Sequence, residues 1–280
     1  MLGTLYIVAT PIGNLQDMTF RAIEVLKNSD YILAESSART SKLLSEFNIK
    51  KRIITFNKDN EKRKKNSVIQ DLSEGMNICL VSDAGTPSVS DPGFELMKYI
   101  DLSFRVVPIP GASSLTAALS VSKIPINNFI FLGFLSKKSS ERKMQLLKIK
   151  TSSMPGIIFE SKHRVISVLS DITDILGGDT NIGIMRELTK IHEEILFGTA
   201  SELTTKFSRE PLTGEITMII GTSAIKQINI ETMEKKISEL SKKYSASEVV
   251  NIIRLFNDIN KKELYKYVLN IRPVSYTHLT

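Results

Sequence analysis

The chain has 280 residues, of which 42% are hydrophobic and 24% are charged, and its formal net charge is +7. This length is enough for a sizeable core and suits two modest domains. The single cysteine, Cys79, excludes a disulfide framework, fits a core position, and is consistent with a reducing compartment, the cytoplasm. No run is long and apolar enough to span a membrane, and the run at residues 5–9 is too short for a signal peptide.

Apolar runs alternate with helical patterns through residues 1–122, which predicts a domain with a largely parallel sheet covered on both faces. The expected strands are residues 5–9, 31–34, 52–56, 77–81 and 105–108. The expected helices are residues 19–27, 67–74, 94–100 and 113–121. Gly75 directly follows one of these helices, where glycine favours a left-handed cap.

A linker at residues 123–128 is expected to open a second α/β domain that extends to residue 225. Its expected strands are residues 129–133, 156–160, 182–187, 193–197 and 215–221. Its expected helices are residues 140–150, 164–176 and 201–207.

The pattern from residue 226 to 271 is helical and predicts a small appendage. Ser245 and Glu248 have the spacing of a capping box, and Asn260 with Glu263 has the spacing of a further cap. Short helices with tight turns are typical of a helix-turn-helix-like module, and equally of a packing extension. Residues 272–280 break the helical pattern and resemble a translated sequencing adapter, so we interpret them as a non-native tail.

Three loops rich in small residues follow three expected strands, at residues 10–15, 82–93 and 108–114. The carboxyl ends of parallel strands lie at one edge of a sheet, where open α/β sheets hold ligands. One such loop is also typical of an ordinary turn between a strand and a helix, whereas three in register favour a ligand crevice. The carboxylates Asp83 and Asp91 favour a ligand with hydroxyl groups or a positive charge.

These loops resemble the motifs of the tetrapyrrole-methylase-like (class III) S-adenosylmethionine methyltransferases. The motifs are PIGNL at 11–15, SDAGTP at 82–87 with DPG at 91–93, and PGAS at 110–113. Within the family, further stretches are similar, in order, to members that methylate a ribose in 16S ribosomal RNA. Those stretches are residues 133–135, 139–142, 159–164, 186–194 and 214–216.

The resemblance implies an α/β protein of two domains, with S-adenosylmethionine in the cleft between them, that forms a homodimer. It implies 2′-O-methylation of a cytidine in the decoding region of 16S rRNA in the small ribosomal subunit, with neither DNA nor a membrane as partner. The cofactor contacts that it implies are Pro11, Gly13, Asp83, Ala84, Gly85, Thr86, Gly111, Ser113, Ser114 and Glu215.

A ribose hydroxyl is a poor nucleophile, so a base or a polarising cation is expected beside it. The candidates at expected strand ends are Glu35, Arg186, Glu187 and Lys190, and the sequence leaves the identity of the base open. Where the family has Ala-Glu-Asp-Thr-Arg, residues 34–39 are AESSAR. Arg39 therefore stands one residue late, a rotation of about 100° on a helix. His163 and His192 have no second ligand at metal spacing, so no metal is expected.

Two basic segments, residues 50–65 and 137–150, each resemble a solvated surface, but together they suit a protein that contacts RNA phosphates. Two other functions stay open at this point. One is methylation of a tetrapyrrole ring carbon, and the other is RNA binding or ribosome assembly without catalysis, which the altered segment at residues 35–40 would fit.

Overall fold

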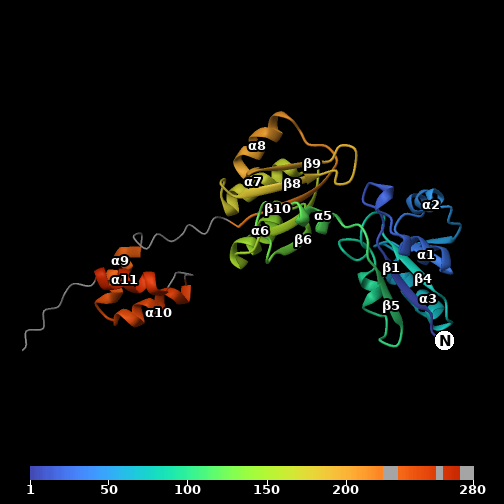
Figure 1. Cartoon of the computed structure of the whole chain (residues 1–280), viewed down its shortest axis with the longest axis horizontal. Coiled ribbons are helices and arrows are strands. Elements are labelled where there is room, and N and C mark those ends of the chain that lie inside the picture. The colour runs from blue at the N-terminus through green and yellow to red at the C-terminus, as the bar shows by residue number, and fades with distance from the viewer. Residues whose placement is uncertain (223–232, 257–260, 272–280) are drawn as a thin grey trace, which may run out of the picture. The chain divides into compact units, whose positions relative to one another are not determined.

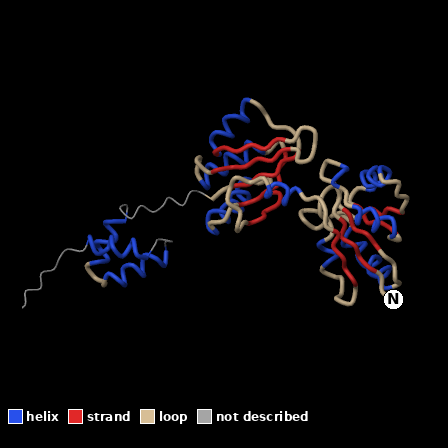
Figure 2. Tube along the Cα trace, viewed as in Figure 1, coloured by secondary structure: helices blue, strands red, loops and turns tan. Residues whose placement is uncertain are grey.

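The computed structural model describes residues 1–222, 233–256 and 261–271, and the chain divides into two compact units, Met1–Thr222 and Ser223–Thr280 (Figure 1). Unit 1 contains two five-stranded sheets with helices packed on them (Figure 2). The described part of unit 2 is helical. Among the described residues of both units, no helix is long and apolar enough to cross a membrane.

The first sheet is parallel throughout, as the alternating pattern predicts, and its strand order is β3-β2-β4-β1-β5. Its strands are β1 (Thr4–Val8), β2 (Tyr31–Ala34), β3 (Arg52–Thr55), β4 (Ile78–Val81) and β5 (Arg105–Ile109). The helices of this region are η1 (Leu15–Asp17), α1 (Phe20–Asn28), α2 (Ser37–Glu46), α3 (Glu61–Ser73), α4 (Phe94–Met97) and α5 (Ser114–Ser120).

Both faces of the first sheet are covered. On one face, Ala22 and Leu26 of α1 and Leu44 of α2 pack against strand residues that include Cys79, which is fully buried as expected. On the other face, α3 and α4 pack against the alternate residues of the same strands. Because successive side chains of a strand point to opposite faces, the continuous apolar strands of this sheet supply both clusters.

The second sheet is mixed, with the order β6-β7-β10-β8-β9, and only β6 and β7 pair in parallel. Its strands are β6 (Ile130–Phe134), β7 (Gly156–Ser161), β8 (Asn181–Arg186), β9 (Glu194–Thr199) and β10 (Glu215–Ile220). One face is covered by α6 (Ser139–Ser152), α7 (Val165–Leu176) and α8 (Ala200–Arg209).

The other face of the second sheet is covered by segments that follow strands of the first. Ala118 of α5 and Ile12 of the loop after β1 share a buried cluster with Ile157, Met185 and Ile219 of the second sheet. This cluster packs the loops of the first sheet against the second, and so determines which side chains meet between the two sheets.

Unit 2 has its own core. Its helices are α9 (Glu234–Ser241), α10 (Ala246–Phe256) and α11 (Lys261–Ile271), and they share a cluster that includes Ile237, Val250, Leu264 and Val268. The predicted capping box is confirmed, since Glu248 accepts from the Ser245 amide at 2.8 Å and its own amide donates to Ser245 Oγ at 3.3 Å. The predicted cap at Asn260 and the tail at 272–280 lie outside the described residues.

Among the α-helices, two depart most from the sequence predictions. α2 was not expected as an element of its own, and it begins after Ser36, whose side chain accepts from the Arg39 amide. α3 begins six residues earlier than predicted, at Glu61, which is buried and accepts from the Gly93 amide at 3.0 Å. A contact between Glu61 and a residue 32 positions away is not visible in local patterning.

Candidate functional site

The loops singled out in the sequence meet because β2, β4, β1 and β5 are neighbours in that order. The loop after β1 and the loop after β4 pair directly, with Thr10 and Gly85 exchanging two backbone hydrogen bonds of 2.9 Å. The loop after β5 joins them where the Ala9 amide donates to the Ile109 carbonyl at 3.3 Å. The predicted crevice at the carboxyl edge of the parallel sheet is therefore present.

A cavity of about 630 Å³ lies at this edge, between the loops of the first sheet and the strand ends of the second. Its size is that of a site for a small organic ligand. The first sheet and its loops contribute Ile12, Glu35, Arg39, Asp83, Ala84, Gly85, Thr86, Val89, Ser90, Asp91, Ser113 and Ser114. The second contributes Phe134, Phe159, Glu160, Ser161, Lys162, His163, Met185, Leu188, Gly214, Glu215, Ile216 and Thr217.

The charge of the cavity is opposite to that of the chain. Among the lining residues, the acidic ones are Glu35, Asp83, Asp91, Glu160 and Glu215, and the basic ones are Arg39 and Lys162. The chain as a whole carries +7. An acidic, partly enclosed wall in a basic protein favours a small ligand that carries positive charge.

Asp83 is held by contacts from α2 and from the residue before that helix. Its Oδ1 accepts from the Ser36 amide at 3.0 Å, and its Oδ2 accepts from Arg39 Nη1 at 3.1 Å. Its own amide donates to Glu35 Oε2 at 3.4 Å. Arg39, one residue late against the family pattern, thus still reaches the cavity, and it joins the start of α2 to the loop after β4.

Asp91 stands in the same wall and is harder to ionise. Burial is the main cause that raises the pKa of its carboxyl to about 6; the nearby negative charge of Glu35 contributes to this rise, and Ser82 and Lys58 oppose it. A cation placed beside this wall would favour the ionised form. Asp91 is therefore a carboxylate whose charge responds to what enters the cavity.

The loop after β4 also holds unusual backbone conformations. Ser88 and Ser90 have φ values of 70° and 68°, and Gly85 and Gly93 have values of 79° and 127°. Such conformations cost energy in residues other than glycine, and they concentrate where function demands a particular loop shape. A Cβ on Gly93 would lie 2.6 Å from Ser88 Oγ, so this position accepts little other than glycine.

The wall from the second sheet is more apolar. Phe159 packs edge-on against Phe131 and Phe134, with ring centroids 5.1 Å and 5.6 Å away. Next in the chain to Phe159, buried Glu160 pairs with Arg164 at 3.2 Å, and Arg164 also donates to the Leu135 carbonyl at 2.9 Å. These contacts fix the ends of β6 and β7 against each other.

Three predicted catalytic candidates lie at the end of β8 and in the turn that follows it, outside the cavity lining. Glu187 Oε1 accepts from the Glu215 amide at 2.8 Å and from Lys190 Nζ at 2.9 Å, and Lys190 also pairs with Glu215 at 2.9 Å. The Glu215 amide is the main cause of the lowered pKa of Glu187. Arg186 pairs with Glu194 at 3.0 Å. This network holds the segment that lines the cavity at Gly214 and Glu215.

The predicted cofactor residues divide into two groups. The cavity is lined by Asp83, Ala84, Gly85, Thr86, Ser113, Ser114 and Glu215, and by the catalytic candidate Glu35. Pro11, Gly13 and Gly111 are not among the lining residues. A Cβ on Gly111 would lie 3.0 Å from that of Ala9, and one on Gly13 would lie 2.4 Å from Lys190 Cγ, so both positions pack closely against a neighbouring segment.

The structure adds residues that the sequence did not assign to the site. Asp91 was noted as a carboxylate of the loop but was not among the expected contacts, and Arg39 was of uncertain use. Phe134 stood in the stretch 133–135 that resembles the family, but no role was assigned to it. The acidic loop motif could have identified Asp91, whereas Phe134 enters only because the two sheets face each other.

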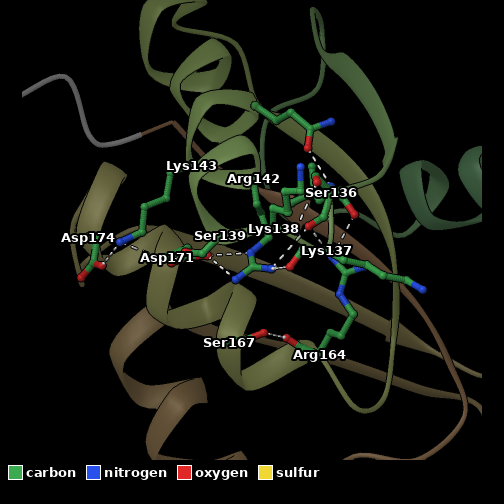
Figure 3. A network of polar contacts seen from close by, with 12 residues as sticks. Ser136, Lys137, Lys138, Ser139, Arg142, Lys143, Arg164, Ser167, Asp171 and Asp174 are labelled. Atoms are coloured by element: carbon green, nitrogen blue, oxygen red, sulfur yellow. Dashed lines mark hydrogen bonds and ion pairs between the residues drawn. The ribbon is translucent and has the colours of Figure 1, made fainter.

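The two basic segments differ once folded. In α6, buried Arg142 pairs with Asp171 at 2.6 Å, and Lys143 pairs with Asp174 at 2.7 Å (Figure 3). Arg142 belongs to the basic segment at 137–150, but its buried charge is paired with Asp171 and serves the packing of α6 against α7. In α3, Lys62 and Arg63 are exposed.

The fold and the cavity together define a class: α/β proteins of two sheets, with a cavity of ligand size between the loop edge of a parallel sheet and the strand ends of a second, mixed sheet. Residues 4–204 match the family model described as Tetrapyrrole (Corrin/Porphyrin) Methylases, and the chain belongs to that family.

Relatives and a solved structure agree with this assignment. The chain is 41% identical to Ribosomal RNA small subunit methyltransferase I of Buchnera aphidicola, over 96% of this chain and 97% of that protein. It is 41% identical to the protein of the same name from Thermotoga maritima, with 78% of this chain covering 98% of the relative. Uroporphyrin III C-methyl transferase from Thermus thermophilus shares the fold, with a TM-score of 0.56, 12% identity, and coverage of 78% of this chain and 97% of that one.

Proposed function

We propose that this protein transfers a methyl group from S-adenosylmethionine to the 2′-hydroxyl of a cytidine in the decoding region of 16S rRNA. The observation that carries the proposal is the acidic cavity of about 630 Å³ in a chain with a net charge of +7. The relatives named Ribosomal RNA small subunit methyltransferase I support the choice of acceptor. This work would be done in the cytoplasm by a homodimer.

The residues of the cavity suit S-adenosylmethionine. A sulfonium and an ammonium are positive, and the carboxylates of Glu35, Asp83 and Asp91 complement them. Gly85 presents bare backbone to the cavity with φ at 79°, which allows a ligand to approach closely. Phe159, Met185 and other apolar residues of the second sheet offer the kind of surface on which a purine ring packs.

The chemistry is a methyl transfer. When bound, S-adenosylmethionine supplies an electrophilic methyl group: the ribose oxygen bonds to its carbon, the carbon–sulfur bond breaks with its electron pair kept on sulfur, and the hydroxyl proton leaves. The protein must hold the acceptor oxygen in line with that bond and close to it. Glu35 and Asp91 are the carboxylates that we propose for the proton, because Asp83 is already bonded to Ser36 and Arg39.

The network of Arg186, Glu187 and Lys190 positions the cavity wall and does not contact the ligand itself. It holds the turn after β8 against Gly214 and Glu215, and the Lys190 side chain lies against Gly13 of the opposite loop. We therefore assign these three residues to shaping the cavity. Their replacement should weaken cofactor binding without changing the chemistry of the step.

The test is transfer of tritium from labelled S-adenosylmethionine to three acceptors: small ribosomal subunits, free 16S rRNA and a tetrapyrrole precursor. Label at the 2′-oxygen of one cytidine in the RNA or the subunit is expected. Label in the tetrapyrrole alone would contradict the proposal and favour ring-carbon methylation. Label in none of them, with RNA binding retained, would favour a non-catalytic assembly protein.

A further inference from the structure

The basic charge of the chain is concentrated in unit 2. The described residues of this unit, 233–256 and 261–271, include eight Lys or Arg and four Asp or Glu, in a chain whose whole net charge is +7. The residues that line the cavity all lie in unit 1. The charge of unit 2 therefore belongs to a surface other than the methyl-transfer cavity.

Within unit 2, α11 combines positive charge with exposed aromatic and apolar side chains. Leu264 and Val268 are fully buried in the unit's core, which fixes the orientation of the helix. The outward stripe at i, i+3, i+4 and i+7 is then Lys262, Tyr265, Lys266 and Leu269. Tyr265 is 39% exposed and Leu269 is 48% exposed.

The second helix of the unit has a different surface. The exposed positions of α10 include Glu248, Asn251 and Arg254, a mixture of signs. The stripe that combines lysines with an exposed tyrosine therefore lies on α11 and not on α10.

We propose that α11 is an RNA-anchoring helix, in which lysines meet phosphates and Tyr265 stacks on an unpaired base of the ribosomal RNA. Exposed aromatic side chains interleaved with positive charge are the usual platform for single-stranded nucleic acid. This inference rests on the proposed function for the identity of the RNA.

The length of a relative supports an accessory role. An alignment of 220 residues accounts for 98% of the Thermotoga maritima protein, and unit 1 of this chain spans Met1–Thr222. The family model ends at residue 204. A relative named Ribosomal RNA small subunit methyltransferase I is thus about the size of unit 1, so unit 2 is expected to add affinity for the acceptor and not to take part in the methyl transfer.

The experiment uses the full chain. The variants are Tyr265→Ala, Tyr265→Phe and the double change Lys262→Glu with Lys266→Glu. The control is Lys206→Glu with Arg209→Glu, the same charge change on exposed residues of α8. Binding to 16S rRNA is measured by fluorescence anisotropy over a range of salt without methyl donor, and methyl transfer is measured in parallel. Thermal unfolding checks that every variant folds.

The double change and Tyr265→Ala should each weaken RNA binding and raise KM for RNA about tenfold, with kcat and methyl-donor affinity unchanged. Tyr265→Phe should bind like the parent because it keeps the ring. The double change should also reduce the slope of log affinity against log salt by about 1.4, from about 0.7 for each phosphate contact on a single strand.

Two outcomes would overturn the inference. One is that the α11 variants bind RNA as the parent and the α8 control do. The other is that they lose binding to anionic phospholipid vesicles while keeping binding to RNA, which would identify a lipid surface as the partner. RNA binding is measured without donor and so does not depend on methyl transfer. Failure of methyl transfer would contradict the proposed function, and the binding data would still test the role of α11.

Discussion

The cavity of unit 1 and the surface of α11 carry charge of opposite sign, and they hold it in different ways. Asp83 is tied by the Ser36 amide and Arg39, and Asp91 is buried enough that its pKa rises to about 6. The lysines of α11 are exposed. Fixed charge in a partly enclosed site suits one small cation, whereas exposed charge suits a polyanion and is screened by salt. The difference predicts that donor and acceptor binding can be broken separately.

Asp83→Ala should cause the largest effect, a loss of donor binding with no change in RNA binding. It removes an acceptor for the Ser36 amide and leaves the guanidinium of Arg39 without this carboxylate at the mouth of the acidic wall. Because hydrogen bonds to charged groups contribute about 1.5–3 kcal/mol each, we expect a loss of about 100-fold in affinity for S-adenosylmethionine by calorimetry. RNA affinity should not change.

The matched control for this change is Asp101→Asn, which alters an exposed carboxylate whose hydrogen-bond partner is the nearby residue Ser103. It should bind the donor like the parent protein. If Asp83→Ala keeps a donor affinity within twofold of the parent, the loop after β4 does not contribute to donor binding.

The next largest effect is expected from salt, which should weaken RNA binding much more than donor binding. Raising potassium chloride from 50 to 250 mM should weaken binding of 16S rRNA about tenfold or more, because each phosphate contact releases condensed counterions. Donor affinity should change less than threefold over the same range, because the carboxylates of the cavity act over short distances in a partly enclosed site. Equal salt dependence of the two affinities would contradict the assignment of the acidic wall to the donor.

A pH titration of donor binding should give a smaller effect. The pKa of Asp91 in the free protein is about 6, raised by burial and by Glu35, with Asp83 adding to the shift and Lys58 opposing it. A bound cation favours the carboxylate, so donor affinity should be greatest above pH 6 and fall up to tenfold as the pH drops to 5. Calorimetry in buffers of different ionisation enthalpy should show a proton released on binding near pH 5.5.

The same shift affects stability with a definite sign. The folded pKa of Asp91 lies above its unfolded value of 3.8, so the folded, donor-free protein binds more protons between about pH 4 and 6. The free energy of unfolding should therefore fall as pH rises through this window. Asp91→Asn should remove that decline and stabilise the free protein at pH 7, while weakening donor binding and abolishing its pH dependence. A variant that titrates like the parent would exclude Asp91 as the responsive group.

Much of this arrangement could be predicted from the sequence because it is local. The strand ends at Thr10, Ser82 and Pro110 are marked by small residues after apolar runs, and a parallel sheet brings such ends to one edge. The rest depends on contacts between distant segments. Phe134 lines the cavity because the second sheet faces the first. Arg39 is held at the cavity by Asp83, which lies 44 positions away in the sequence.

Charge was the least predictable feature. Arg142 is one of several basic residues in a helix and has no local sign that Asp171, 29 positions on, will bury and neutralise it. The opposite holds for α11, where burial of Leu264 and Val268 turns a mixed sequence into a one-sided basic stripe. Net charge in a sequence predicts a class of partner, and only packing decides which of the charges can reach that partner.

The smallest effect follows from this distinction between α6 and the exposed cations. Lys143 lies 2.7 Å from Asp174 and 3.5 Å from Asp171, so its charge is largely compensated on the protein itself (Figure 3). Lys143→Ala should change affinity for 16S rRNA less than twofold, whereas Lys62→Ala with Arg63→Ala on α3 should weaken it two- to threefold. Anisotropy at low salt, where surface charge acts most strongly, is the measurement that resolves such a difference. A larger loss of RNA affinity in Lys143→Ala than in the α3 variant would contradict this prediction. It would mean that Lys143 leaves its two aspartates to bind RNA, and that α6 contacts the RNA as α11 does.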